Sequence, residues 1–132
     1  MCGIVGIVSR NNCVNDIVSG LNSLEYRGYD SCGITALNGD VFSYKKSIRK
    51  ISHLEKEIAK EKIKGNMVIG HTRWATHGKP SITNCHPFIK DNCALVHNGI
   101  IENFEELSNY YSLDSKNIIS ETDSEVIAEI FN

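Results

Sequence analysis

The spacing of apolar residues changes repeatedly along this chain, and this alternation is the strongest constraint on its fold. Residues 3–9 form a short β-branched run that predicts a buried strand, and residues 14 to 25 have the apolar periodicity of a helix. Two further apolar runs, 33–37 and 41–44, flank Asn38-Gly39-Asp40, which predicts a hairpin because Asn-Gly tolerates the positive φ of a tight turn. Strands and helices in mixed order predict an α+β domain whose sheets are covered by helices.

The second half of the chain continues the alternation. Apolar residues at helical spacing predict a second helix, namely Ile48, Ile51, Leu54 and Ile58. We expect it to begin in the basic stretch 45–50 and to be closed by Gly65-Asn66. Strands are predicted at 67–70 and 93–97, a helix near Asn103, and a capping box of Thr122 and Glu125 ahead of a last helix. The long polar segment 71–84 is a candidate functional loop.

Charge and hydropathy exclude two classes of partner. The chain has 132 residues, enough for one domain with a real core, and a formal net charge of −2 without a like-charge block. A nucleic-acid partner is therefore not expected, because such proteins carry a basic face. A membrane partner is not expected either, since no run of about 18 apolar residues occurs.

Cysteine usage predicts a cytoplasmic protein with free thiols. Five cysteines are an odd number without the spacing of a disulfide framework, and the start of the chain lacks the basic region of a signal peptide. Cys85-His86 with Cys93 and His97 is the main arrangement that invites a metal interpretation, and a thiol-redox alternative rests only on the number of cysteines. Without Cys-x-x-Cys or His-x-x-x-His pairs, we expect no metal and no other cofactor.

Cys2 is the residue whose position in the chain has the most unusual chemical consequences. If the initiator methionine is removed, the thiol and a free α-amine belong to one residue. The unperturbed amine titrates near pH 8 and the thiol near 8.5, so a neutral amine can accept the thiol proton, directly or through a water. This is the N-terminal form of a nucleophile paired with a base. Position alone leaves the alternative open that Cys2 is a small buried residue at the start of a strand.

Five blocks of the sequence, in order, carry a resemblance to a known family. They are Cys-Gly-Ile-Val-Gly (2–6), Leu-Glu-Tyr-Arg-Gly-Tyr-Asp-Ser (24–31), Gly-His-Thr-Arg-Trp-Ala-Thr-His-Gly (70–78), His-Asn-Gly-Ile-Ile-Glu-Asn (97–103) and Ser-Glu-Thr-Asp-Ser-Glu (120–125). Together they resemble the glutaminase domain of the glutamine–fructose-6-phosphate aminotransferases (isomerizing), also called glucosamine-6-phosphate synthases. These are class II amidotransferases with an N-terminal nucleophile.

The resemblance implies a fold and a reaction. The fold is the α-β-β-α sandwich of the N-terminal-nucleophile hydrolases, here incomplete at the C-terminus, with exposed apolar edges. Residues 1–132 would be a partial glutaminase domain, without the sugar isomerase domains. The reaction is hydrolysis of L-glutamine to glutamate and ammonia. In the full-length enzyme, a homodimer, the ammonia converts fructose 6-phosphate to glucosamine 6-phosphate. The alternative is an inactive truncated remnant, or a fragment that binds glutamine without turnover.

Two charged residues would bind the two charged ends of glutamine. The resemblance implies that Arg73 clamps the α-carboxylate, which suits its planar donor fork, and that Asp123 accepts the α-ammonium. Each has a simpler explanation taken singly. Arg73 would also suit a surface ion pair, and Asp123 would suit the first turn of a helix, where the dipole favours negative charge.

Asn98 and Gly99 would form the oxyanion hole, with the Asn side-chain amide and the Gly backbone N–H as donors. In isolation Asn-Gly favours a hairpin turn instead. The resemblance places Trp74, Thr76 and His77 in a loop that closes over glutamine and excludes water. A core anchor is the alternative for Trp74. His71, His86 and His97 are expected to be structural hydrogen-bonding residues rather than bases.

Overall fold

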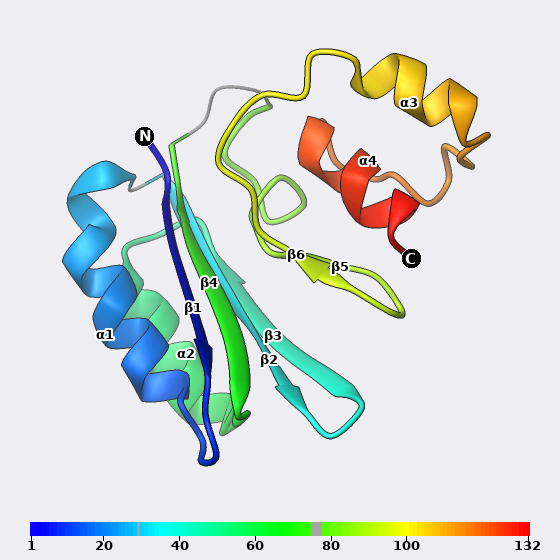
Figure 1. Cartoon of the computed structure of the whole chain (residues 1–132). Coiled ribbons are helices and arrows are strands. Elements are labelled where there is room, and N and C mark those ends of the chain that lie inside the picture. Colours follow the sequence, from blue (N-terminus) through cyan, green and yellow to red (C-terminus); the bar gives the residue numbers. More distant parts are fainter. Residues whose placement is uncertain (29, 75–77) are drawn as a thin grey trace.

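The computed structural model describes residues 1–28, 30–74 and 78–132 of the chain. Its main sheet has four antiparallel strands in the order β1-β4-β2-β3. These are β1 (Gly3–Val8), β2 (Ser31–Asn38), β3 (Val41–Ser47) and β4 (Met67–Arg73). Helices α1 (Val14–Leu24) and α2 (Ile51–Glu61) cover one face of this sheet, and the 3-10 turn η1 (Glu25–Arg27) leads from α1 toward β2 (Figure 1).

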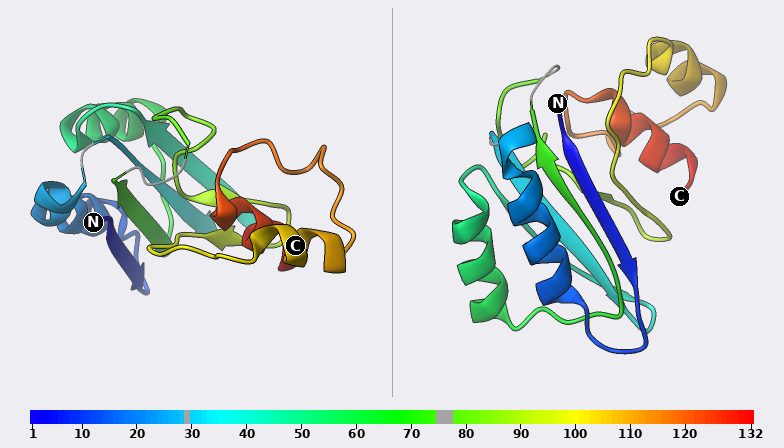
Figure 2. Two further views of the ribbon diagram at one scale, coloured as in Figure 1. Left: turned by 90° about the horizontal axis from the view of Figure 1, so that it is seen from above. Right: turned by 60° about the vertical axis from the view of Figure 1, so that its left-hand side comes forward.

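The opposite side of the sheet carries a second, smaller layer. A two-stranded sheet pairs β5 (Phe88–Ile89) with β6 (Ala94–Leu95), and helix α4 (Asp123–Ile130) packs on it. Helix α3 (Phe104–Tyr110) packs in turn against α4. Figures 1 and 2 show helices, main sheet, small sheet and helices in succession. The predicted α+β class and the α-β-β-α order are therefore confirmed, with a second sheet of only two short strands among the described residues.

The core lies between the main sheet and the two helices on its outer face. Its centre consists of fully buried aliphatic residues from α1, β2, α2 and β4, including Ile17, Leu21, Ile34, Leu54 and Val68. Burying a side chain of this size contributes about 1.5–3 kcal/mol relative to leaving it exposed. This packed core holds β1 and β4 in place, and with them the strand ends that lie at its edge.

The hairpin predicted around Asn38-Gly39-Asp40 is confirmed. Asn38 pairs with Val41, so Gly39 and Asp40 form a two-residue loop, and Gly39 has the expected positive φ of 63°. A residue with a Cβ would be strained at that φ, which explains the glycine.

The burial of one strand and the two ends of one helix differ from the predictions. β1 is an edge strand rather than a buried one, and Ile4 and Val8 are exposed on its open face. The basic stretch 45–50 reaches the helix only at its last residue, because Lys45 and Lys46 lie in β3 and Lys50 is the N-cap of α2. The end of α2 is made by Lys62, which adopts the left-handed conformation with φ 55°, and not by Gly65-Asn66.

β4 is longer than the pattern predicted, and this extension matters for function. His71, Thr72 and Arg73 were expected in a polar loop, but they continue the strand and are buried. β4 is an interior strand with hydrogen-bonded partners on both sides, β1 and β2, so its backbone stays extended whatever the polarity of its side chains. The strand predicted at 93–97 is shorter, because only Ala94 and Leu95 pair with β5.

The predicted capping box before α4 is also different. Thr122 is the N-cap residue, but its side chain accepts no hydrogen bond from the helix. The Glu125 carboxylate instead accepts hydrogen bonds from the backbone N–H groups of Ile119 (3.0 Å) and Ser120 (2.6 Å), and Lys90 lies 3.0 Å away. Burial alone would raise the pKa of Glu125, but hydrogen bonds from Ser120 and Lys90 lower it overall. Glu125 thus fixes the loop ahead of the helix rather than the helix end.

Across the described ranges, none of the helices is both long and apolar enough to cross a membrane.

Candidate functional site

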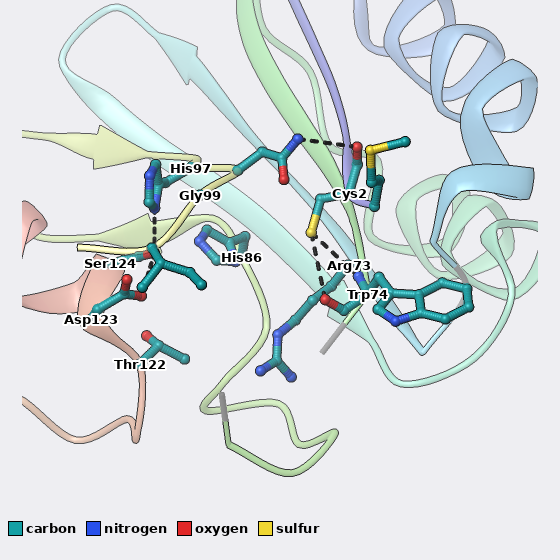
Figure 3. Close-up of a pocket in the computed structure, with 12 residues that line it drawn as sticks. Cys2, Arg73, Trp74, His86, His97, Gly99, Thr122, Asp123 and Ser124 are labelled. Carbon is teal, nitrogen blue, oxygen red and sulfur yellow. Dashed lines mark hydrogen bonds between the residues drawn. The ribbon is translucent and has the colours of Figure 1, made fainter. Parts of the chain in front are cut away.

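A cavity of about 390 Å³ lies where the start of the chain, the end of β4, the segment after β6 and the start of α4 meet (Figure 3). Its volume is in the range of small-molecule sites. Six residues singled out from the sequence line it: Cys2, Arg73, Trp74, Asn98, Gly99 and Asp123. The other two, Thr76 and His77, lie outside the described residues.

The antiparallel pairing of β1 with β4 places Cys2 in this cavity. Gly3 pairs with Thr72, so the residue before the strand lies beside the end of β4. The half-buried Cys2 Sγ accepts a hydrogen bond from the backbone N–H of Trp74 at 3.3 Å (Figure 3). The Trp74 side chain is 46% exposed, so the alternative of a core anchor for this residue is wrong.

Arg73 is buried and holds the chain that follows it. Its guanidinium donates to the backbone carbonyl oxygens of Gly78 (3.2 Å) and Lys79 (3.5 Å), and it lies 4.0 Å from the carboxylate of Asp30. With 3% of its surface exposed, Arg73 is not the surface residue that the alternative interpretation assumed. It brings a fixed positive charge to one side of the cavity.

Asp123 brings a negative charge to the cavity from the first turn of α4. Its carboxylate accepts the backbone N–H of Ile101 at 2.6 Å and the hydroxyl of Ser124 at 3.2 Å. The expected position at a helix start is confirmed, where the helix dipole favours an anion. The bond to Ile101 also ties the segment after β6 to α4.

Asn98 and Gly99 lie beside the start of the chain. The side-chain amide of Asn98 donates to the backbone carbonyl of Cys2 at 3.5 Å. The two residues are not a hairpin turn, because the chain continues from them toward α3 without a second strand. A Cβ at Gly99 would lie 2.7 Å from His97 Nε2, which explains the absence of a side chain there.

Two of the three histidines near the cavity make the expected hydrogen bonds. His71 Nε2 lies 3.0 Å from the carbonyl oxygen of His97 and so carries the proton, and His97 Nδ1 lies 3.0 Å from Ser124 Oγ. The expectation is wrong for His86. Its ring stacks on His71 (centroids 4.2 Å apart) and meets Phe88 edge-on, and neither ring nitrogen has a hydrogen-bond partner among the described residues.

Burial keeps this histidine stack neutral. It lowers the pKa of His71 to about 4 and that of His86 to about 2, and the positive charge of Arg73 acts in the same direction. Neither imidazole is therefore charged near neutral pH.

The depressed pKa values predict a loss of stability in mild acid. Below the ordinary histidine pKa of 6.5, the unfolded chain takes up protons that the folded chain excludes. Two such groups lower the free energy of unfolding by about 2.7 kcal/mol per pH unit until His71 protonates. We expect His86→Phe, which keeps the stack without a titrating group, to reduce this slope by about half, because only one of the two protons is then taken up on unfolding. Urea denaturation between pH 7 and pH 4.5 measures it. His53→Gln, on α2, is the control, and an equal slope in all three proteins would contradict the assignment.

Several cavity-lining residues were not predicted as site residues from the sequence, namely Met1, Ile100, Thr122 and Ser124. All four are direct sequence neighbours of predicted site residues, so their place follows from the same motifs. Among the described residues, no group of three or more His, Cys, Asp or Glu side chains is arranged to hold a metal ion.

Comparison with known proteins identifies a family and several relatives. The family model for class-II glutamine amidotransferases matches residues 2–131. The glutamine–fructose-6-phosphate aminotransferases (isomerizing) of Chlamydia abortus and Bradyrhizobium diazoefficiens are 46% and 45% identical over 99% and 98% of this chain. The chain spans 22% and 21% of the length of these two relatives.

Two solved structures have a fold similar to that of this chain. A glutamine phosphoribosylpyrophosphate amidotransferase from B. subtilis, complexed with ADP and GMP, superimposes with a TM-score of 0.79 and 28% identity. That superposition covers 98% of this chain and 28% of the other. A structure described as the allosteric regulatory enzyme of purine biosynthesis gives a TM-score of 0.77 and 30% identity, covering 97% of this chain and 28% of that one.

Proposed function

The chain belongs to the class-II glutamine amidotransferases, and from that membership we propose that it hydrolyses L-glutamine to glutamate and ammonia, with Cys2 as nucleophile after removal of Met1. The observation that carries the proposal is the meeting of Cys2, Arg73 and Asp123 around one cavity, although they come from three distant parts of the chain. A thiol, a fixed cation and a fixed anion around one cavity suit a substrate that has a charged group of each sign and a carbonyl to attack.

The proposed covalent step begins at the sulfur of Cys2. The thiolate attacks the side-chain amide carbon of glutamine, and the intermediate expels ammonia to leave a thioester. Water then attacks the thioester and releases glutamate with the regenerated thiol. The Trp74 N–H, 3.3 Å from the sulfur, is oriented to stabilise the thiolate by a charge-assisted hydrogen bond.

The proposed base is the α-amine of Cys2 itself. It would accept the thiol proton and return a proton to the departing nitrogen, which removes the need for a histidine. This fits the histidines found here, since His71 is engaged with His97 and burial holds the pKa of His86 at about 2. Met1 lines the cavity, so its removal would both free the amine and open space beside the sulfur.

Asn98 and Gly99 are the proposed oxyanion donors, and Arg73 and Asp123 the proposed partners of the α-carboxylate and α-ammonium. Asn98 Nδ2 lies 3.5 Å from the backbone carbonyl oxygen of Cys2, which supports a role as donor to the oxyanion that would form on the substrate carbon attacked by the sulfur. Trp74, Thr76 and His77 are proposed to contact glutamine from the loop that follows β4. Trp74 is among the residues that line the cavity, which supports this role.

The use of the ammonia is proposed from the names of the relatives. Glutamine–fructose-6-phosphate aminotransferases match nearly the whole of this sequence. We therefore propose that in a full-length cytoplasmic, homodimeric enzyme the ammonia is transferred to fructose 6-phosphate, giving glucosamine 6-phosphate, by domains that the described residues do not include.

A glutamine-shaped electrophile tests the proposal. We expect a diazoketone analogue of glutamine to label the protein once, at Cys2, and L-glutamine to protect against labelling. Peptide mass spectrometry locates the adduct, and the intact mass with N-terminal sequencing shows whether the mature chain begins at Cys2. Labelling at another residue, or a cooperatively folded sample that is not labelled, would contradict the proposal and favour an inactive remnant.

A further inference from the structure

Asn84 connects the two segments that carry the charges of the site. It lies outside the cavity lining, in the turn between β4 and β5, and is 2% exposed. Its side-chain amide donates to the carbonyl oxygen of Lys79 at 3.0 Å and to the carboxylate of Glu121 at 2.9 Å. Its side-chain oxygen accepts the backbone N–H of Glu121 at 2.9 Å. Both donors and the acceptor of this amide are thus used.

One end of this connection reaches Arg73. The Lys79 carbonyl that accepts from Asn84 also accepts from the Arg73 guanidinium at 3.5 Å. Gly78 also packs directly against the Asn84 amide. It has φ 74°, and a Cβ there would lie 2.6 Å from Asn84 Nδ2. Asn84 therefore helps to hold the backbone that holds the guanidinium.

The other end reaches Asp123. Glu121, bound through both its backbone N–H and its carboxylate, is two residues before Asp123 and directly before the N-cap of α4. The orientation of the Asn84 amide is unambiguous, because a flipped amide would set its oxygen against two acceptors and its NH₂ against an N–H.

We propose that Asn84 is a positioning residue that fixes the separation between the Arg73 guanidinium and the Asp123 carboxylate, and so sets recognition of the α-amino acid end of the substrate. The inference rests on the proposed function, because it assigns the two charges to one ligand. It predicts that disturbing Asn84 weakens binding of ligands with both charged groups while the reactivity of Cys2 stays the same.

The test uses Asn84→Asp, which keeps the shape and the acceptor but replaces the NH₂ donor with a carboxylate oxygen facing the Lys79 carbonyl and Glu121. Losing donors in a buried network costs roughly 10- to 100-fold in affinity. We expect the half-saturating concentration of the diazoketone analogue of glutamine to rise by that factor. The maximal rate of labelling, and the rate of Cys2 alkylation by iodoacetamide, should stay at parent values. An analogue without the α-amino group should be affected much less, since it engages only the Arg73 end.

Three further variants make the result specific. Asn84→Asp combined with Glu121→Gln should recover part of the affinity, because the new amide can donate to the carboxylate introduced at position 84. Glu121→Ala removes one partner without altering Asn84 and should raise the half-saturating concentration by a smaller factor, which keeps the test decisive if Asn84→Asp does not fold. Asn109→Asp, on the exposed surface of α3, is the matched control and should behave as the parent.

The outcomes separate the two proposals. A parent protein that the diazoketone does not label at Cys2 overturns the proposed function and this inference with it. A parent that is labelled and protected by glutamine, with an unchanged half-saturating concentration in Asn84→Asp, overturns only the role of Asn84. An equal loss of iodoacetamide reactivity would assign Asn84 to general stability and also overturn it.

Discussion

Replacing Cys2 with alanine is expected to abolish glutamine hydrolysis while the protein remains folded. The sulfur is the only proposed nucleophile, and loss of a nucleophile in covalent hydrolases lowers turnover by about 10⁴-fold or more. Cys2 is half-buried and precedes β1, so few packing contacts are lost with the sulfur. Ammonia release in a coupled assay measures the first effect, and a thermal melt measures the second.

Cys93→Ala is the matched control for this substitution. Cys93 is also a half-buried free cysteine, but its Sγ faces the Ala128 carbonyl and it does not line the cavity. We expect Cys93→Ala to retain parent activity. Activity that survives in Cys2→Ala would show that another group attacks the substrate and would refute the mechanism.

The second large effect is expected from Asn98→Ala. Removing one oxyanion donor typically lowers kcat by about 10²–10³-fold, because the lost hydrogen bond forms fully only in the transition state. KM for glutamine should change little. Steady-state kinetics of ammonia release separate these parameters, and electrophile labelling checks that Cys2 remains accessible.

Asn103→Ala provides the comparison for Asn98. Asn103 is the N-cap residue of α3, its side chain makes no capping hydrogen bond, and it lies outside the cavity lining. Its replacement should leave both parameters near parent values. If Asn98→Ala instead raises KM and preserves kcat, Asn98 binds the substrate rather than the oxyanion.

Local patterns predicted the parts of the fold that short-range geometry controls. The helix α1 and the hairpin of β2 and β3 follow from apolar periodicity and from one glycine at a turn. The extension of β4 through His71 and Thr72 could not be predicted in this way, since polar residues in a row indicate a loop. Those residues stay extended because strands on both sides pair with them.

The candidate site also has residues that local sequence patterns predicted and residues that they did not. Its motif residues were found from the sequence because the blocks that carry them are short and contiguous, and six of them meet at one cavity. The roles of His86 and Asn84 depend on partners distant in sequence, a stacked histidine in β4 for one and Glu121 for the other. No local pattern marks a residue whose partners are set by packing.

The position of Met1 has a practical consequence for anyone who makes this protein. Met1 contributes to the cavity wall beside Cys2, and Gly3 is already paired with Thr72, so a segment joined to Met1 would begin at the cavity. An affinity tag fused ahead of Met1 would keep the nitrogen of Cys2 in a peptide bond, so that nitrogen could not act as the proposed base. Under the proposed mechanism we expect a preparation with such a tag to be inactive, so a purification handle should be placed away from Met1.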